Sequence, residues 1–124
     1  MDVFDILTTP TKIVTNYGET IYELVGRTVA PNTARQSVAY VTIDPQKSSR
    51  RHLHRLTEES YYILAGDAFV EIGEESMPLR AGQIVLIPAK KSHKVYNAGS
   101  DDLVMLVACT PAWEASDVVW LETI

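Results

Sequence analysis

The sequence has one cysteine, three histidines and no long hydrophobic run, and these shortages exclude several classes of protein. A single cysteine, Cys109, rules out an internal disulfide framework and is typical of a reducing compartment. No window approaches the roughly 18 uninterrupted apolar residues that a membrane-spanning helix needs. The first ten residues, MDVFDILTTP, carry acids where a secretory signal would carry lysine or arginine. We therefore expect a cytoplasmic protein without a membrane partner.

Positive charge is also scarce. The 11 lysines and arginines are outnumbered by 16 aspartates and glutamates, which gives a net charge of −5 at pH 7. This balance argues against a nucleic-acid partner. The local exception is a basic cluster formed by Lys47, Arg50, Arg51 and Arg55. With 124 residues, 46% of them hydrophobic, residues 1–124 are expected to form one domain with its own core.

Most of the chain is expected to form short β-strands. Six segments are rich in Val, Ile, Tyr and Thr and are bounded by turn residues: 20–27, 36–43, 60–66, 68–73, 82–89 and 102–110. Gly, Pro, Asn or Asp occur in the reversals between them, as in APNT near residue 30, GEESMP near residue 73 and NAGSDD near residue 97. Strands at this spacing, without amphipathic helices between them, predict an all-β domain built as a small antiparallel barrel or sandwich.

The three histidines form the most informative pattern in the chain. His52 and His54 are two residues apart, so on a strand their side chains point to the same face. Glu59 follows after a possible bend, and a hairpin partner could present its carboxylate beside the two imidazoles. His93 comes from a distant segment, just after the strand expected at 82–89. Nitrogen and oxygen ligands of this kind suit Fe, Mn, Ni, Cu or Zn.

Two interpretations of this pattern compete. A histidine pair on a strand is often a solvated face. Here, however, all three histidines of the protein fall into one constellation, which favours metal binding. Four protein ligands on a six-coordinate ion would leave two positions for water, dioxygen or a chelating substrate.

The spacing of these residues resembles two motifs of the cupin family over roughly residues 35–110. The first motif is matched by His52, His54, Glu59 and Gly66. The second motif is matched by Gly82, Pro88, His93 and Asn97. The resemblance implies a small β-barrel, or jelly roll, around one divalent transition metal held by His52, His54, Glu59 and His93. It also implies a homodimer, for which the strand-like flanks at 12–27 and 111–124 are candidate interface segments.

The sequence departs from the motifs at two glycines, which are replaced by Gln46 and Lys90. Gln46 suggests a turn that does not need a positive φ. Lys90 either reaches the mouth of the barrel or is solvated. Glu58 and Glu59 compete for the carboxylate ligand position, and the six residues that separate Glu59 from the motif glycine select Glu59. Glu58 is then expected to face solvent.

Three residues are candidates for substrate binding. By alternation Arg50 lies on the histidine face, where its guanidinium could clamp a carboxylate or phosphate, whereas Arg51 points away. Tyr61 is expected to point inward beside the metal, and Lys90 is the third candidate. For each of them the alternative is structural: a solvated strand end for Arg50, core packing for Tyr61 and simple solvation for Lys90.

We therefore predict a metal-dependent enzyme that acts on a small, anionic organic molecule by dioxygenase-type oxidation. Oxidation ranks ahead of the alternative, a sugar or sugar-phosphate isomerase or epimerase, because the motifs contain no second acid–base group. A further alternative is a cupin that binds or senses a metal or small ligand without turnover. The resemblance in fold cannot decide among these functions.

Overall fold

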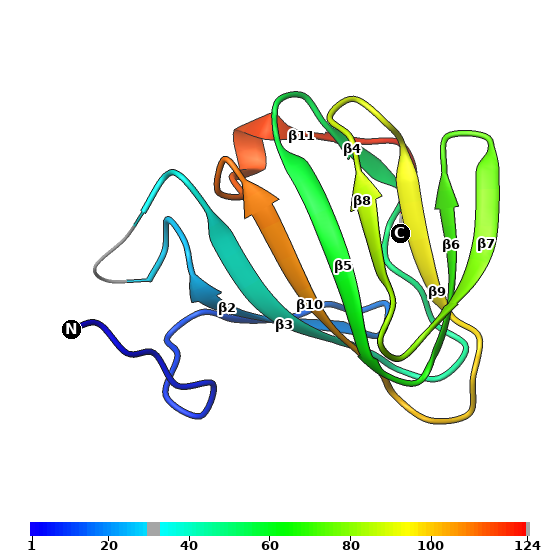
Figure 1. Cartoon of the computed structure of the whole chain (residues 1–124), viewed down its shortest axis with the longest axis horizontal. Helices are drawn as coiled ribbons and strands as arrows, with labels where there is room; N and C mark the ends of the chain where they lie inside the picture. The colour runs from blue at the N-terminus through cyan, green and yellow to red at the C-terminus, as the bar shows by residue number, and fades with distance from the viewer. Residues whose placement is uncertain (30–32, 124) are drawn as a thin grey trace.

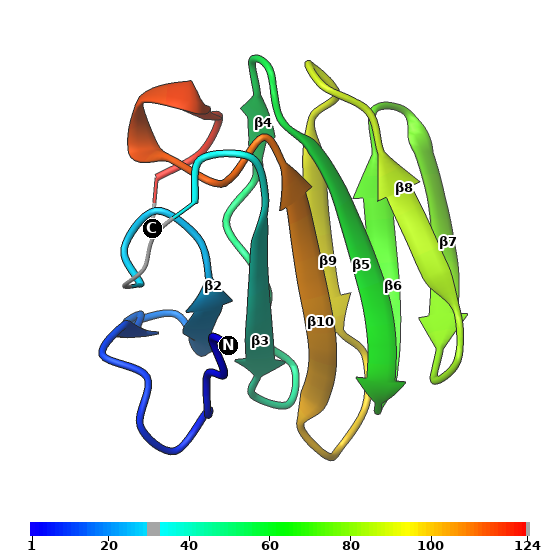
Figure 2. The same ribbon diagram turned by 60° about the vertical axis from the view of Figure 1, so that its left-hand side comes forward.

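Two facing antiparallel sheets make up the computed structural model, which describes residues 1–29 and 33–123 (Figures 1 and 2). Three of the four residues of the predicted APNT turn, 30–32, therefore lie outside the described residues, and so does the last residue of the C-terminal flank, 124. In the six-stranded sheet the order is β1 (Lys12–Val14), β2 (Glu19–Val25), β3 (Ser37–Ile43), β10 (Leu103–Thr110), β5 (Glu58–Ala65) and β8 (Ile84–Ile87). In the five-stranded sheet it is β11 (Val118–Trp120), β4 (His52–His54), β9 (His93–Asn97), β6 (Asp67–Ile72) and β7 (Glu75–Arg80).

The core lies between the two sheets because their inward-facing residues are apolar at every second position. In β10 the buried residues are Leu103, Met105, Val107 and Cys109, and the residues between them are less buried. The other strands of the core contribute Val41, Ile43, Ile63, Val70, Ile87 and Val95. The prediction of an all-β barrel is confirmed.

The six strands expected from the sequence all form, with ends that differ by at most two residues. The predicted reversal GEESMP is partly wrong, because Glu75 already begins β7. Its Pro78 would break a central strand, but β7 is the edge of its sheet, where a missing N–H is tolerated. The sequence also gave no expectation for β9, whose inward residues His93, Val95 and Asn97 are mostly polar and hide the usual alternation of apolar residues.

The predicted hairpin between the His52–His54 strand and the Glu59 strand is wrong. β4 pairs with β11 and β9, whereas β5 pairs with β10 and β8. The chain crosses from one sheet to the other at residues 55–57, so Glu59 faces the histidines instead of lying beside them. This crossing is held by Asp117 in the 3-10 helix η1 (Ala115–Asp117), whose carboxylate accepts hydrogen bonds from the backbone N–H groups of Leu56 (2.8 Å) and Thr57 (3.1 Å).

The expectation that Gln46 avoids a positive φ is also wrong. Gln46 has φ 62° and Lys90 has φ 70°, so both positions keep the left-handed backbone that the family's glycines would favour. Neighbouring hydrogen bonds hold these turns: Gln46 Nε2 donates to the carbonyl of Gly99 (2.9 Å), and the Lys90 N–H donates to that of His54 (2.6 Å). The second bond ties the Lys90 turn directly to the histidine strand.

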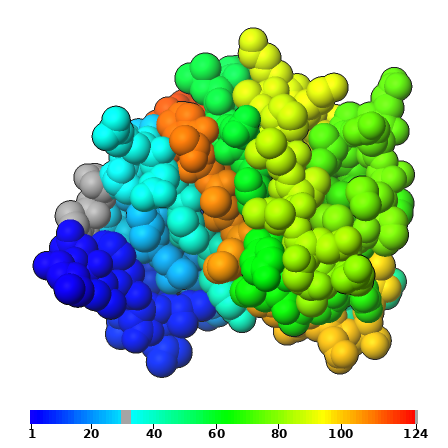
Figure 3. Space-filling model, in the orientation of Figure 1, coloured from blue at the N-terminus to red at the C-terminus, as the bar shows by residue number. Residues whose placement is uncertain are grey.

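The N-terminal flank adds two strands to one sheet, and the C-terminal flank adds one strand to the other. β1 and β2 extend the six-stranded sheet beyond β3, and β11 extends the five-stranded sheet beyond β4. The N-terminal residues (blue) consequently lie on the side of the molecule away from the β6–β7 hairpin (green) in Figure 3. Among the described residues no helix has the length and apolar character needed to cross a membrane.

Candidate metal centre and its cavity

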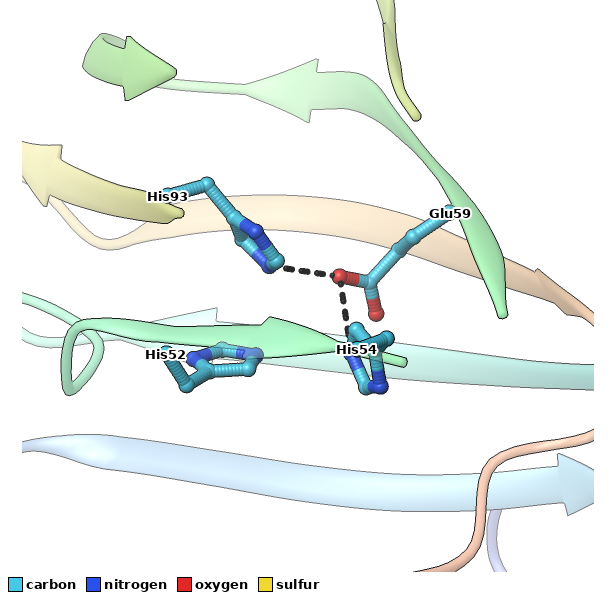
Figure 4. A group of neighbouring side chains, drawn as sticks. All are labelled: His52, His54, Glu59 and His93. Atoms are coloured by element: carbon cyan, nitrogen blue, oxygen red, sulfur yellow. Dashed lines mark hydrogen bonds and ion pairs between the residues drawn. The ribbon is translucent and has the colours of Figure 1, made fainter. Parts of the chain in front are cut away.

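The four predicted ligands come together between the two sheets (Figure 4). His52 and His54 project from β4 and His93 from β9 in one sheet, and Glu59 projects from β5 in the other. One ligand atom from each residue lies within 4.8 Å of those of the other three. Glu59, His54 and His93 are at most 4% exposed, and His52 is 9% exposed. Glu58, the competing carboxylate, is exposed.

The Glu59 carboxylate lies at the middle of the cluster. Its Oε1 atom is 2.9 Å from Nε2 of His93 and 3.5 Å from Nε2 of His54. Its Oε2 atom accepts a hydrogen bond from the Cys109 thiol at 3.2 Å. Both oxygens of this buried carboxylate therefore face polar groups, and one oxygen faces two imidazoles at once.

The outer nitrogen of each imidazole faces an oxygen of the protein. Nδ1 of His52 lies 2.6 Å from the Arg50 carbonyl, and Nδ1 of His93 lies 3.1 Å from the Lys91 carbonyl. A carbonyl can only accept, so these two Nδ1 atoms carry the hydrogen and their Nε2 lone pairs are left for the centre. Nδ1 of His54 is 3.5 Å from Asp117 Oδ2. Outer contacts of this kind orient the histidine ligands of metal sites.

These contacts fit a metal ion. With its hydrogen on Nδ1, His93 presents a lone pair to the Glu59 oxygen only 2.9 Å away, which requires a proton or a cation between them. Among the described residues neither buried ring nitrogen of His54 has a hydrogen-bond partner, an arrangement that proteins rarely leave uncompensated. Three imidazole nitrogens and one carboxylate form a donor set suited to a divalent transition ion.

The cluster also sets the protonation of its own members. Burial alone would raise the pKa of Glu59, but the close contacts and charges of His54 and His93 outweigh it and hold the pKa well below its usual range. Burial, reinforced by His93, lowers the pKa of His52 to about 4. Burial opposes protonation of His54 as well, yet Glu59 and Asp117 outweigh it and raise that pKa. At neutral pH Glu59 is thus ionised and His52 neutral, the forms in which each can bind a metal.

A cavity of about 110 Å³ opens beside the cluster, and His52 and Glu59 form part of its wall. Most of the remaining wall is apolar and comes from the six-stranded sheet, including Ile21, Ala39, Val41, Met105 and Val107. Cavities of this type, apolar with a few polar groups, are typical of sites for small molecules. The size suits a small organic molecule better than a polymer.

Two of the three predicted substrate-binding residues line this cavity. Arg50 lies on its wall, with its guanidinium carbon 4.4 Å from the centre of the Trp120 ring and its Nε donating to the Glu122 carbonyl at 2.6 Å. Tyr61 also lines the cavity and is 4% exposed. Lys90 is exposed and is not part of the cavity wall, so the structure does not bring it to the site.

Several residues of the site were missed from the sequence. Trp120 packs against both Arg50 and His52, and Asp117 faces His54, but both are far along the chain from their partners and no spacing points to them. Glu19 lies on the cavity wall. The sequence could have predicted this position, because Glu19, Ile21 and Glu23 occupy alternate positions of one strand and must share a face.

Comparison with known proteins identifies the fold and the family. The family described as "Cupin domain" matches residues 39–109. An uncharacterized protein of Methanocaldococcus jannaschii is 29% identical over 109 residues, which cover 88% of this chain and 86% of that protein. The oxalate-binding protein of Thermotoga maritima is 30% identical over 83 residues, or 67% of this chain and 68% of that protein. The solved structure of Pac13, a Streptomyces nucleoside dehydratase, superposes with a TM-score of 0.81, covers 100% of this chain and 93% of its own, and shares 12% identity, which supports the fold alone.

Proposed function

This chain belongs to the cupin family, and on that premise we propose that it is a metal-dependent enzyme acting on a small organic anion. The observation that carries the proposal is the meeting of two features in one cavity. His52 and Glu59 of the ligand cluster form part of its wall, and so does Arg50. A cation site beside a fixed positive side chain favours a ligand with at least one negative group.

An ion held by the three histidines and Glu59 would supply a Lewis acid that polarises an oxygen of the bound molecule. The chain's own residues would bind and orient that molecule. Arg50 is already positioned, because its side chain stacks on Trp120 and its Nε is bonded to Glu122. A carboxylate would therefore meet a preorganised donor. The apolar wall of the six-stranded sheet would exclude water from the other side.

Oxalate is a suitable first probe for this anion. The similar protein of Thermotoga maritima is described as oxalate-binding. Oxalate consists of two carboxylates alone, so its binding tests the anion site without contributions from other parts of a ligand. Its two carboxylates could contact Arg50 and the cation together. The proposal extends to small carboxylates as a class and does not require that oxalate is the natural ligand.

The proposal covers two reaction classes, and a sensor without turnover is the alternative to it. Oxidation of the anion by dioxygen would need an iron-type ion with open positions. Isomerisation or epimerisation, as on a sugar or sugar phosphate, would need a side chain that moves a proton. A sensor would need only the ion and the anion. Oxygen-uptake assays with enolisable diketones, thiols and catechols separate the first class from the other two.

We also propose a homodimer formed through the flanking strands. β1 and β11 are edge strands, and edge strands are the usual sites at which two sheets join. Val14 in β1 is 68% exposed, and Trp120 and Leu121 at the end of β11 are 44% and 45% exposed. Analytical ultracentrifugation of the wild type and of Val14→Lys would test this, with a monomeric variant as the expected result.

Metal and anion binding are the decisive tests of the proposed function. Purified protein is expected to retain about one ion per chain after dialysis, and isothermal titration is expected to show one oxalate site that requires the ion. His52→Ala should lose both. Leu53→Ala is the matched control, because Leu53 is the intervening residue of the same strand and points away from the cluster. Full metal retention in His52→Ala, or no oxalate binding by the metal-loaded wild type, would contradict the proposal.

A further inference from the structure

A second acidic residue faces the cavity from the sheet opposite the histidines. Glu19, Ile21 and Glu23 occupy alternate positions of β2, and all three line the cavity. The wall of the cavity therefore carries three carboxyl groups, from Glu19, Glu23 and Glu59. Glu59 belongs to the metal cluster, so the other two remain to be explained.

Glu23 and Glu19 differ in what holds them. The Oε1 atom of Glu23 accepts hydrogen bonds from the backbone N–H (3.2 Å) and the hydroxyl (2.7 Å) of Thr28, so this carboxylate fastens the loop after β2. The carboxyl of Glu19 takes part in none of the hydrogen bonds or ion pairs found among residues 1–29 and 33–123. Its backbone, in contrast, is fixed at both ends by Thr15, whose hydroxyl donates to the Glu19 carbonyl (2.7 Å) and accepts from the Glu19 N–H (3.0 Å).

The pKa of Glu19 also suits proton exchange at neutral pH. Burial raises the pKa of the Cys109 thiol and of the Tyr61 hydroxyl, and the Glu59 charge raises both further, so each keeps its proton. Burial, assisted by the charge of Glu59, raises the pKa of Glu19 to about 7. An acid–base group works best when its pKa lies near the working pH.

Glu19 and Arg50 line the same cavity, and together they favour a particular kind of ligand. Both residues line the cavity, and Tyr17, another residue of the wall, lies within electrostatic reach of each. Arg50 and the histidine cluster come from one side, and Glu19 comes from the facing sheet. A small molecule with its carboxylate at Arg50 and its carbonyl oxygen at the cluster would present the adjacent carbon to Glu19.

We propose that Glu19 is the catalytic acid–base residue that removes and returns a proton at the carbon next to the carbonyl of a small 2-oxo acid. The inference rests on the proposed function, because it needs the same cavity and the same ion. The C–H bond breaks, the proton passes to the Glu19 carboxylate, and the electron pair moves onto the carbonyl oxygen to give an enolate. Return of the proton restores the keto acid. The step consumes no oxidant, so it favours redox-neutral proton transfer over oxidation by dioxygen.

Hydrogen–deuterium exchange tests the inference directly. The zinc-loaded protein is incubated with 2-oxobutyrate in D₂O, and loss of the C3 proton signal is followed by NMR. The wild type is expected to accelerate the exchange, and Glu19→Gln to slow it by about 100-fold or more. Glu74→Gln is the charge-matched control, because Glu74 is exposed in the turn between β6 and β7 and lies outside the cavity. Equal rates in Glu19→Gln and the wild type would overturn the inference.

A readout that does not depend on turnover completes the test. With ¹³C-labelled glutamate, the carboxyl signal of Glu19 is identified by its absence in Glu19→Gln and is expected to shift when oxalate is added. A signal that does not move would overturn the inference. So would a wild type that binds zinc and oxalate but does not accelerate exchange, an outcome that leaves the proposed function intact. Failure to bind zinc or oxalate would instead overturn the proposed function itself.

Discussion

Two carboxyl groups face the same cavity from the same sheet, yet their surroundings are opposite. Glu59 on β5 contacts two imidazoles and a thiol, and its pKa lies well below the usual range. Glu19 on β2 has no polar partner for its carboxyl among the described residues, and its pKa is raised to about 7. Burial pushes both pKa values upward, so burial alone cannot explain the difference. The donors that surround each carboxyl decide its charge.

This contrast distinguishes two roles of a carboxyl group, which are to bind a metal ion and to transfer a proton. A ligand carboxylate must stay ionised, which the histidines around Glu59 ensure. A proton-transfer group must change its state at the working pH, which an isolated, partly buried carboxyl can do. The sheet places both kinds of acid on one inward face, and side chains from the opposite sheet distinguish them.

The largest expected effect follows from removing the acid that holds the ion. Zinc at a free concentration 1,000 times its Kd should raise the free energy of unfolding of the wild type by about 4 kcal/mol. Glu59→Gln should lose most of this gain because it removes the only negative ligand of the cluster, whereas Glu19→Gln should keep it. Urea unfolding with and without zinc measures both. A similar zinc effect in Glu59→Gln would show that the two acids are not distinguished as described.

The next effect concerns the metal-free protein and its pH dependence. The folded-state pKa of Glu19, about 7, lies above its ordinary value of 4.5, so ionising Glu19 opposes folding as the pH rises through this interval. The cost is absent below pH 4.5 and complete above pH 7, where it reaches up to about 3 kcal/mol. Glu19→Gln should therefore be more stable than the wild type at pH 8 and equally stable at pH 4. Urea unfolding at the two pH values checks this, and equal stability at pH 8 would contradict it.

A smaller effect on anion binding should distinguish Arg50, which lines the cavity, from the neighbouring Arg51. Arg50→Gln is expected to weaken oxalate binding by about 10- to 100-fold, the equivalent of losing a charge-assisted hydrogen bond of about 1.5–3 kcal/mol. Arg51→Gln is the matched control, because Arg51 is paired with Glu71 at 2.6 Å and is not part of the cavity wall. Isothermal titration measures both variants. Equal losses would mean that general positive charge, and not the position of Arg50, attracts the anion.

The smallest effect is expected from a substitution that changes neither Glu19 nor Glu59. Lys90→Gly should raise the free energy of unfolding by about 1 kcal/mol, because glycine adopts φ 70° without the strain of a side chain. Gln46→Gly should gain less, since it also loses the hydrogen bond from its side chain to Gly99. Oxalate affinity should be unchanged in Lys90→Gly. A clear loss of affinity would instead return Lys90 to the substrate-binding residues.

The sequence predicted the strands because the alternation of side chains is a local rule, and it predicted the ligand cluster because the spacing of its residues resembles two cupin motifs. Alternation placed His52 and His54 on one face, and the distance to Gly66 selected Glu59 over Glu58. The sequence could not predict that β4 and β5 lie in different sheets, because a crossing and a hairpin need similar short connections. It also could not find Asp117 and Trp120, since only the pairing of β11 with β4 brings them to the histidines.

Glu19 marks a different kind of limit. The alternation with Ile21 could have predicted that the Glu19 side chain points inward. Its proposed role, however, depends on a difference between two carboxyl groups: Glu23 accepts hydrogen bonds from Thr28, and Glu19 does not. Such differences arise from tertiary contacts and leave no pattern in the chain. Oxidation was favoured because the motifs held no second acid–base group, and the carboxyl that fills this gap lies outside both motifs, on β2.

Because Arg50 stacks on Trp120, the fluorescence of this tryptophan should report on ligand binding. Trp113 and Trp120 are the only tryptophans in the sequence, and both line the cavity. The centre of the Trp120 ring lies 4.4 Å from the guanidinium carbon of Arg50 and 5.1 Å from the centre of the His52 ring. Its emission should respond both to an anion that draws the guanidinium away and to quenching by a paramagnetic ion at the histidines. In Trp113→Phe all tryptophan fluorescence comes from this one indole, so unlabelled protein could be screened against compound libraries in a plate reader.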